Sequence, residues 1–242
     1  METGIYKLAD RRVEICSLHS AVHRLCRDYA AEGEPDFTVR ISQADIDLER
    51  EKNARQNASG GQPSDDYLET LAVYRKIAET MLCYDTLLIH GSAIALDGAG
   101  FLFTAKSGTG KSTHTRLWRE RFGSRAVMVN DDKPLVRLTQ DGAWVCGTPW
   151  DGKHRLSSNI SVPLRAICLL ERGTENEITP ISAQEALPML LQQCYRPRES
   201  RKLMKLLALM DDLAQRTAFF RLHCNMDPEA AQTAWEGLQN SL

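Results

Sequence analysis

The apolar positions along the chain follow two periods, which together predict an α/β protein. Short apolar runs typical of buried strands alternate with longer segments in which residues such as Leu68, Leu71 and Ile77 recur near helical spacing. Strands are predicted at 4–16 (one or two strands), 37–41, 87–89, 93–96, 100–104, 126–129, 135–138, 144–146, 163–170 and 219–224. Helices are predicted at 18–29, 65–84, 113–121, 182–195, 203–213 and 227–238, the fourth opened by a capping pair of Ser182 and Glu185.

Two of these strand pairs are predicted to be β-hairpins. Asp97-Gly98 separates the runs 93–96 and 100–104, and a turn at Gln140–Gly142 separates 135–138 from 144–146. A doubly wound nucleotide-binding domain alternates strand with helix instead. The sheet should therefore be mixed and not purely parallel.

The boundary between two parts of the chain is predicted after residue 64. Residues 45–66 are first highly charged and then rich in Asn, Ser and Gly at 57–61, which is typical of a surface helix that runs into an inserted loop. Residues 1–64 would form a small α/β extension packed on the core. Residues 65–242 would form the main domain.

A glycine-rich segment, Ala105 to Ser112 with the sequence AKSGTGKS, joins the strand 100–104 to the helix 113–121. Strand, loop, Lys-Ser and helix in this order predict a phosphate-binding loop (P-loop), although the first position, normally Gly, is Ala105. Backbone N–H groups of such a loop and the helix N-terminus point at one anion. The residues expected to hold ATP are Ser107, Gly108, Thr109, Gly110, Lys111, Ser112 and Thr113. Lys111 would reach the outer phosphates, and the Ser112 hydroxyl would bind Mg²⁺.

An acidic pair, Asp131-Asp132, follows the strand 126–129. Carboxylates at the end of a neighbouring strand suit a Mg²⁺–phosphate site, so Asp131 is expected to share the metal with Ser112. An aspartate is ionised at neutral pH and can accept the proton of a hydroxyl acceptor. A pair of this kind can also form a solvated turn at the end of a strand. His90, which ends the strand 87–89, is either a core histidine or a member of the site.

Basic residues further along the chain are candidates for contacts to the acceptor or to the γ-phosphate. Lys153 and His154 follow a Pro-Trp-Asp-Gly loop, and Arg198 lies in a second basic cluster. Such charge runs often form only a solvated face.

The motifs together resemble a known family. His90-Gly91-Ser92, a hairpin, the glycine-rich loop and Asp131-Asp132 resemble the catalytic core of HPr kinase/phosphorylase, and the loop also resembles that of ATP-dependent phosphoenolpyruvate carboxykinase. The segment 147–153 is similar to a bacterial group of stand-alone HPr-kinase-like proteins. The resemblance covers about residues 87–172 well. The segment after the aspartate pair differs from the signature of HPr kinases, which leaves the acceptor open.

The resemblance implies an HPr kinase/phosphoenolpyruvate carboxykinase-like nucleotide-binding core with β-hairpins around the P-loop. It implies that Lys111 binds phosphate, that Asp132 (or Asp131) takes the acceptor's proton, and that His90 lies close to that carboxylate. It places an arginine near the reacting phosphate, for which Arg198 is the candidate. A homo-oligomer is also expected, because family members often assemble into rings.

Composition and charge limit the kinds of partner that we expect this protein to bind. The chain has 242 residues and a formal net charge of −2, which gives no electrostatic footprint for nucleic acid or an anionic membrane. No apolar run is long enough to span a bilayer, and the N-terminus lacks the pattern of a signal peptide. The cytoplasm is therefore the expected location.

The function expected from the sequence is that of an ATP-dependent kinase, a phosphotransferase with an alcohol group as acceptor. The acceptor would be a serine of a peptide or protein, or a small molecule. The alternative is a nucleotide-dependent binding or sensing module with little or no transfer activity. Turnover that depends on an added hydroxyl compound separates the two.

Overall fold

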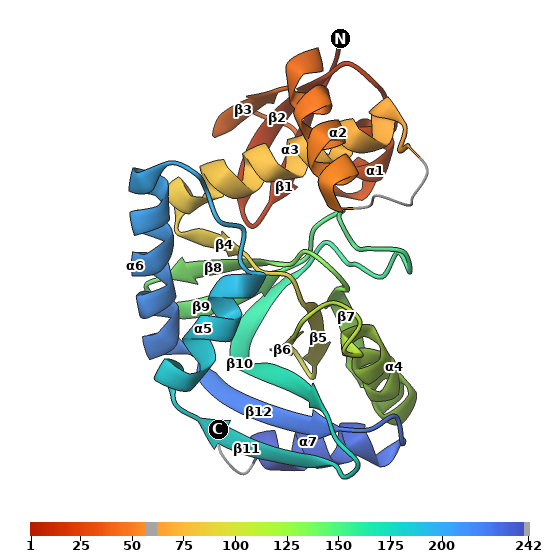
Figure 1. Cartoon of the computed structure of the whole chain (residues 1–242), viewed down its shortest axis with the longest axis vertical. Helices are drawn as coiled ribbons and strands as arrows, with labels where there is room; N and C mark the ends of the chain where they lie inside the picture. The colour runs from red at the N-terminus through yellow and green to blue at the C-terminus, as the bar shows by residue number, and fades with distance from the viewer. Residues whose placement is uncertain (57–61, 240–242) are drawn as a thin grey trace. The chain divides into compact units, whose positions relative to one another are not determined.

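The computed structural model describes residues 1–56 and 62–239 of the chain. The chain divides into two compact units, Met1–Met81 and Leu82–Leu242 (Figure 1). Helix α3 (Asp65–Met81) thus belongs to the first unit, so the boundary lies further along the chain than the sequence analysis places it. The predicted Asn-, Ser- and Gly-rich loop at 57–61 lies outside the described residues.

The first unit combines a three-stranded sheet with three helices. Its strands are β1 (Glu2–Leu8), β2 (Arg11–Ser17) and β3 (Phe37–Arg40); β1 and β2 are antiparallel, whereas β2 and β3 are parallel. Its other helices are α1 (Ala21–Leu25), followed by a 3₁₀ turn at Arg27–Tyr29, and α2 (Gln43–Gln56). The carboxylate of Glu69 on α3 is buried and accepts the backbone N–H groups of Leu18 and His19, at 2.6 and 2.9 Å. This contact fixes the chain between β2 and α1 against α3.

The second unit is built on a nine-stranded mixed sheet, as the hairpin pattern predicts. The strands are β4 (Thr86–Leu88), β5 (Ser92–Leu96), β6 (Ala99–Thr104), β7 (Ala126–Asn130), β8 (Leu135–Thr139), β9 (Gly142–Cys146), β10 (Ser161–Arg172), β11 (Glu177–Ile181) and β12 (Ala218–Cys224). β5–β6 and β8–β9 are the two predicted antiparallel hairpins. The long strand β10 pairs parallel with β6 and β12 and antiparallel with β9, so it connects both halves of the sheet.

Helices cover the two faces of this sheet (Figure 1). α5 (Ala183–Gln193) and α6 (Ser200–Arg216) pack on one apolar core, with Leu190 and Leu213 fully buried. α4 (Lys111–Phe122) and α7 (Glu229–Gln239) pack on the other, around the buried Trp118. Short 3₁₀ turns occur at Leu82–Tyr84 and Gly123–Arg125. The capping box of Ser182 and Glu185 at the start of α5 is confirmed.

One strand, β11, was not predicted from the sequence. β11 pairs antiparallel with β12 at the edge of the sheet, and only two of its residues, Ile178 and Ile181, are strongly apolar. It also contains Pro180, which an edge strand accepts because one side of its backbone needs no sheet partner.

No helix within the described part of the chain is long and apolar enough to cross a membrane.

Candidate functional site

The glycine-rich loop connects the carboxyl end of β6 to the first residue of α4. Gly108 and Gly110 have φ values of +79° and +124°, in the region that favours glycine. The backbone N–H and the hydroxyl of Thr109 both donate to the carbonyl of Lys106, at 3.3 and 2.8 Å. Arg172, at the end of β10, donates to the carbonyls of Gly108 and Thr109 at 2.5 and 3.3 Å. Hydrogen bonds within the loop and from a neighbouring strand therefore hold its shape. Arg172 is not among the site residues predicted from the sequence.

Lys111 lies over this loop at the N-terminus of α4. Its Nζ donates to the carbonyls of Ala105 and Lys106 at 3.0 and 3.4 Å, and the residue is buried. Burial lowers the pKa of Lys111, and the nearby Asp132 opposes that shift. The positive end of the helix dipole and the ammonium group are thus at the same place, where they favour an anion.

Asp131 is fixed by a hydroxyl group from another strand, which is itself bonded to a hydroxyl group of α4. Its Oδ1 accepts a hydrogen bond of 2.6 Å from Ser92 on β5, and the Ser92 hydroxyl also lies 2.8 Å from that of Thr115 on α4. All three side chains are buried. The bonds hold the end of β7 against the helix that follows the loop. Nothing in the local sequence around Thr115 points to this contact.

Asn130 shapes the turn that carries both aspartates. Its side chain is fully buried; Oδ1 accepts the backbone N–H groups of Asp132 and Lys133 at 2.8 and 2.6 Å. Its Nδ2 donates to the carbonyl and hydroxyl oxygens of Thr148, at 2.9 and 3.1 Å. Both halves of the amide are used, so the side chain sets the direction in which the aspartates point. Asn130 is not among the site residues predicted from the sequence.

This arrangement predicts a large effect of an isosteric change. In Asn130→Asp, an acceptor oxygen would replace the donor that faces two oxygens of Thr148. That oxygen would lose both bonds, and the buried side chain would gain a negative charge. We expect the free energy of unfolding to fall by about 1–3 kcal/mol, the usual cost of an unsatisfied buried polar group. Urea denaturation followed by circular dichroism measures this change. An unaltered midpoint would mean that the amide does not hold the turn.

Asp132 is surrounded by a histidine and a lysine. His90 Nε2 lies 3.4 Å and Lys133 Nζ lies 3.1 Å from its Oδ1. The other ring nitrogen of His90, Nδ1, is 3.0 Å from Oε1 of Gln193, at the end of α5. Burial, together with the charges of Lys133 and Lys111, lowers the pKa of His90 to about 4. The imidazole is therefore neutral at neutral pH.

These groups face one open cavity of about 580 Å³. It is lined by Ser107, Gly108 and Gly110 of the loop, by Lys111, Ser112 and Thr113 of α4, and by His90, Asp131 and Asp132. Gly152, Lys153 and His154 line it from the segment between β9 and β10. Almost all the residues predicted from the sequence thus meet here. Arg198, an exposed residue between α5 and α6, is not among the described residues that line the cavity.

A second pocket of about 430 Å³ lies beside the same loop. Gly108, Gly110 and Thr113 line both spaces, whereas Thr109 lines only the second. The far wall of the second pocket includes Leu170, Cys224 and Met226, and apolar surface predominates in it. A flat apolar group next to a chain of phosphates would match the two spaces together.

The residues present fit a magnesium ion shared with phosphate oxygens. Asp131 and Ser112 supply a carboxylate and a hydroxyl to the same cavity, and hard oxygen ligands of this kind suit Mg²⁺. Across residues 1–56 and 62–239, no group of three or more His, Cys, Asp or Glu side chains could hold a metal. A protein site with few ligands is what Mg²⁺ takes when substrate phosphates and water complete its shell.

Comparison with known proteins gives one family. A sequence model of the family described as "SynChlorMet cassette protein ScmC" matches residues 66–230, more than half of the chain. The matched segment contains the glycine-rich loop, the aspartate pair and every residue that lines the cavity. No curated protein matches the chain.

Proposed function

The chain belongs to the ScmC family of SynChlorMet cassette proteins, and we propose that it is an ATP-dependent kinase that phosphorylates a hydroxyl group. One observation carries the proposal. A single cavity contains the glycine-rich loop with Lys111, the metal-suited Asp131, and an aspartate next to a neutral histidine. A site that only binds nucleotide needs the first two groups but has no use for the third.

The donor side of the site accounts for ATP binding. Backbone N–H groups of the loop and the first turn of α4 would hold the phosphates, with Lys111 directed at the outer ones. A Mg²⁺ ion on Ser112 and Asp131 would neutralise charge on the phosphates. The second pocket, between the loop and Met226, would take the base of the nucleotide.

The acceptor side depends on Asp132. Phosphoryl transfer needs little covalent help, so the protein's task is to position the acceptor and remove its proton. Asp132 is half-buried and faces the cavity. Its carboxylate accepts a hydrogen bond from the Lys133 ammonium, whose positive charge offsets part of the negative charge of the carboxylate. His90 is held by Gln193 and orients the carboxylate from its other side. Lys153 and His154, both exposed at the cavity, would contact the γ-phosphate or an acceptor.

A labelled transfer assay tests the proposal. The full chain is incubated with Mg²⁺ and γ-labelled ATP, together with serine-containing peptides or hydroxyl metabolites, and labelled products are separated. We expect label to appear in a hydroxyl compound with the wild type and to be nearly absent with Asp132→Asn. ATP binding without labelled product from any acceptor, or with hydrolysis alone, would favour the alternative of a binding or sensing module.

The lowered pKa of His90 predicts a pH dependence of stability. The imidazole titrates near 6.5 in an unfolded chain and at about 4 in the folded protein, so protons bind preferentially to the unfolded state. The contribution of His90 is therefore present above pH 6.5 and is lost as the pH falls toward 4. Between these values we expect the wild type to lose on the order of 1–3 kcal/mol more than His90→Asn.

Chemical denaturation of both proteins at about pH 7 and pH 4.5 measures this difference. Asparagine retains a donor near the position of Nδ1, so the contact to Gln193 can persist. His114, whose pKa burial lowers to about 3, is present in both proteins and cancels in the comparison. Parallel pH profiles would show that His90 is not held neutral by the fold.

A further inference from the structure

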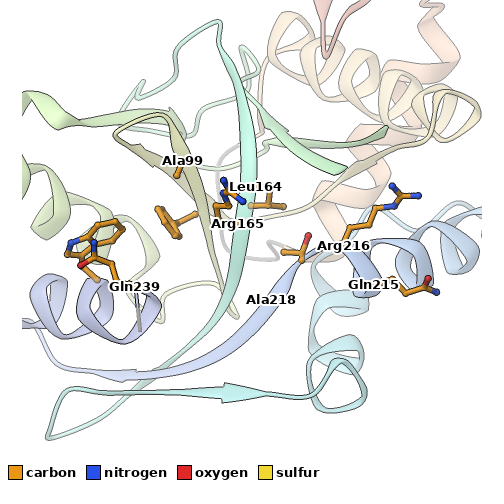
Figure 2. A pocket seen from close by; sticks show the side chains of 10 residues that line it. Ala99, Leu164, Arg165, Gln215, Arg216, Ala218 and Gln239 are labelled. Carbon is orange, nitrogen blue, oxygen red and sulfur yellow. The ribbon is translucent and has the colours of Figure 1, made fainter. Parts of the chain in front are cut away.

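A pocket of about 640 Å³ lies at the end of the sheet away from the glycine-rich loop. Its wall includes Ala99, the first residue of β6, whereas the loop begins after the last residue of the same strand. Figure 2 shows Arg165 on β10 between Gln239 of α7 on one side and Arg216 of α6 on the other. The pocket belongs wholly to the second unit and shares no lining residue with the cavity at Asp132.

Arg165 is directed by an irregularity of the sheet. Along β10, Leu164 pairs with Gly100 of β6 and Ala166 pairs with Phe101, so Arg165 is an extra residue in a β-bulge. Bulges turn a side chain out of the regular alternation of a strand and often occur next to binding sites. The side chain of Arg165 is exposed and has no hydrogen bond or ion pair with any other described residue. Its guanidinium thus has five donors available to a ligand.

Thr217 provides a second polar group that the fold does not satisfy. The residue is 7% exposed, and its buried Oγ1 has no hydrogen-bond partner among the residues that the structure describes. The first residue pair between β10 and β12 is Ala166 with Ala218. Arg165 precedes Ala166 and Thr217 precedes Ala218, so the two residues lie side by side on neighbouring strands. A buried hydroxyl without a partner is costly, and a ligand that accepts or donates a hydrogen bond there would remove that cost.

The remaining wall contains two aromatic rings and a second cation. Phe101 and Trp235 line the pocket and meet edge to face, with ring centroids 5.8 Å apart. Arg216 adds a second cation, but its Nε already donates to Asp212 at 2.6 Å. No described side chain that lines the pocket is acidic.

We propose that this pocket binds a small molecule in which a carboxylate or phosphate group is attached to a flat apolar body. The anionic group would accept two hydrogen bonds from the guanidinium of Arg165 and would also bond to the hydroxyl of Thr217. The apolar body would lie against Trp235 and Phe101. The site is independent of the nucleotide site, so this proposal and the proposed kinase activity can fail separately.

Matched probes test the proposal on the full chain by ¹H–¹⁵N NMR titration. Benzoate and phenyl phosphate carry the two candidate anions, benzamide removes the charge from benzoate, and inorganic phosphate removes the apolar body. We expect one of the two aromatic anions to shift the backbone amides of Phe101, Arg165 and Ala218. The tighter of the two identifies the anion. Benzamide and inorganic phosphate should each bind at least about tenfold more weakly than their aromatic anion partner.

Variants assign the contacts. Arg165→Gln should weaken the aromatic anion by about ten- to a hundredfold, and Thr217→Val should weaken it by about two- to tenfold. Arg201→Gln, at an exposed arginine in the first turn of α6, is the matched control and should change nothing. Thermal melts confirm that each variant folds; Thr217→Val removes a hydroxyl without a partner and should not lower the midpoint.

Several results would overturn the proposal. They are equal binding of benzoate and benzamide, equal binding of inorganic and phenyl phosphate, an unchanged affinity in folded Arg165→Gln, and shifts confined to residues 105–113. Absence of binding by both aromatic anions at tens of millimolar would overturn it as well.

Discussion

Asp132→Asn is expected to lose roughly 10²–10⁴-fold in phosphoryl transfer while it retains most of its affinity for ATP. The amide has nearly the shape of the carboxylate and can still accept the Lys133 ammonium, which lies 3.1 Å from Oδ1. It cannot take the proton of an acceptor hydroxyl. Asp131, whose Oδ1 is held by Ser92, is left unchanged to serve the metal. Single-turnover transfer and calorimetric ATP binding on the same variant measure the two effects.

Comparison with His90→Ala and a Mg²⁺ titration show which role Asp132 has. His90→Ala should lose less than Asp132→Asn, because in the proposed mechanism His90 orients the carboxylate and does not itself take the proton. If Asp132 were chiefly a metal ligand, Asp132→Asn would bind Mg-ATP weakly and excess Mg²⁺ would partly restore the rate. Near-normal transfer would remove Asp132 from both roles. Asp131 and Asp151 would then be the remaining candidates for the base.

Asp151 has properties that make this second outcome informative. It is buried, burial raises its pKa, and it accepts a hydrogen bond of 3.0 Å from Ser157. The neighbouring Gly152 lies directly against Asp132, since a Cβ atom at that position would be 3.3 Å from the Asp132 Cβ. Asp151 is nevertheless not among the described residues that line the cavity, so we place the base at Asp132.

Lys111→Ala should abolish transfer and weaken ATP binding by about ten- to a hundredfold, the cost of losing charge-assisted hydrogen bonds to phosphate. The ammonium group is buried at the start of α4 and donates to the backbone carbonyls of Ala105 and Lys106. Those weak bonds would be exchanged for phosphate oxygens when ATP binds. Isothermal titration calorimetry with Mg-ATP measures the loss.

Lys106→Ala is the matched control for this variant. Lys106 lies in the same loop, but its side chain is exposed and it does not line the cavity in the described structure. Removing this second lysine keeps the change in net charge identical and should alter ATP affinity by less than about threefold. Equal losses in the two variants would mean that net charge, not the position of Lys111, attracts the nucleotide. Unchanged affinity in Lys111→Ala would mean that the loop is only a structural turn.

Local features of this protein could be predicted from the sequence because their causes lie within a few residues of each other. The turn at Asp97-Gly98 closes the β5–β6 hairpin, with φ values of +50° and +82° at these two residues. Ser182 and Glu185 cap α5 through bonds between neighbouring turns. The order of strand, glycine-rich loop and helix at 99–122 is likewise a local pattern. The mixed character of the sheet followed from these hairpins.

Contacts that define the site were decided only by the tertiary structure. Periodicity does not state that β5 lies between β6 and β7, yet this order brings Ser92 to Asp131 and to Thr115. The register of α5 against the end of β4 brings Gln193 to His90, 103 residues away in sequence.

The same distinction applies at the other end of the sheet. In the sequence, Arg165 is an ordinary polar residue of a predicted strand. A one-residue shift in the pairing of β10 with β6 places it in the wall of the pocket. The edge strand β11 was not predicted because its pairing with β12, and not its own apolar pattern, holds it in place. Side-chain chemistry and local spacing therefore determined which groups are candidates for the site. Long-range strand pairing, whose free energy comes from contacts between distant segments, decided which of those groups meet.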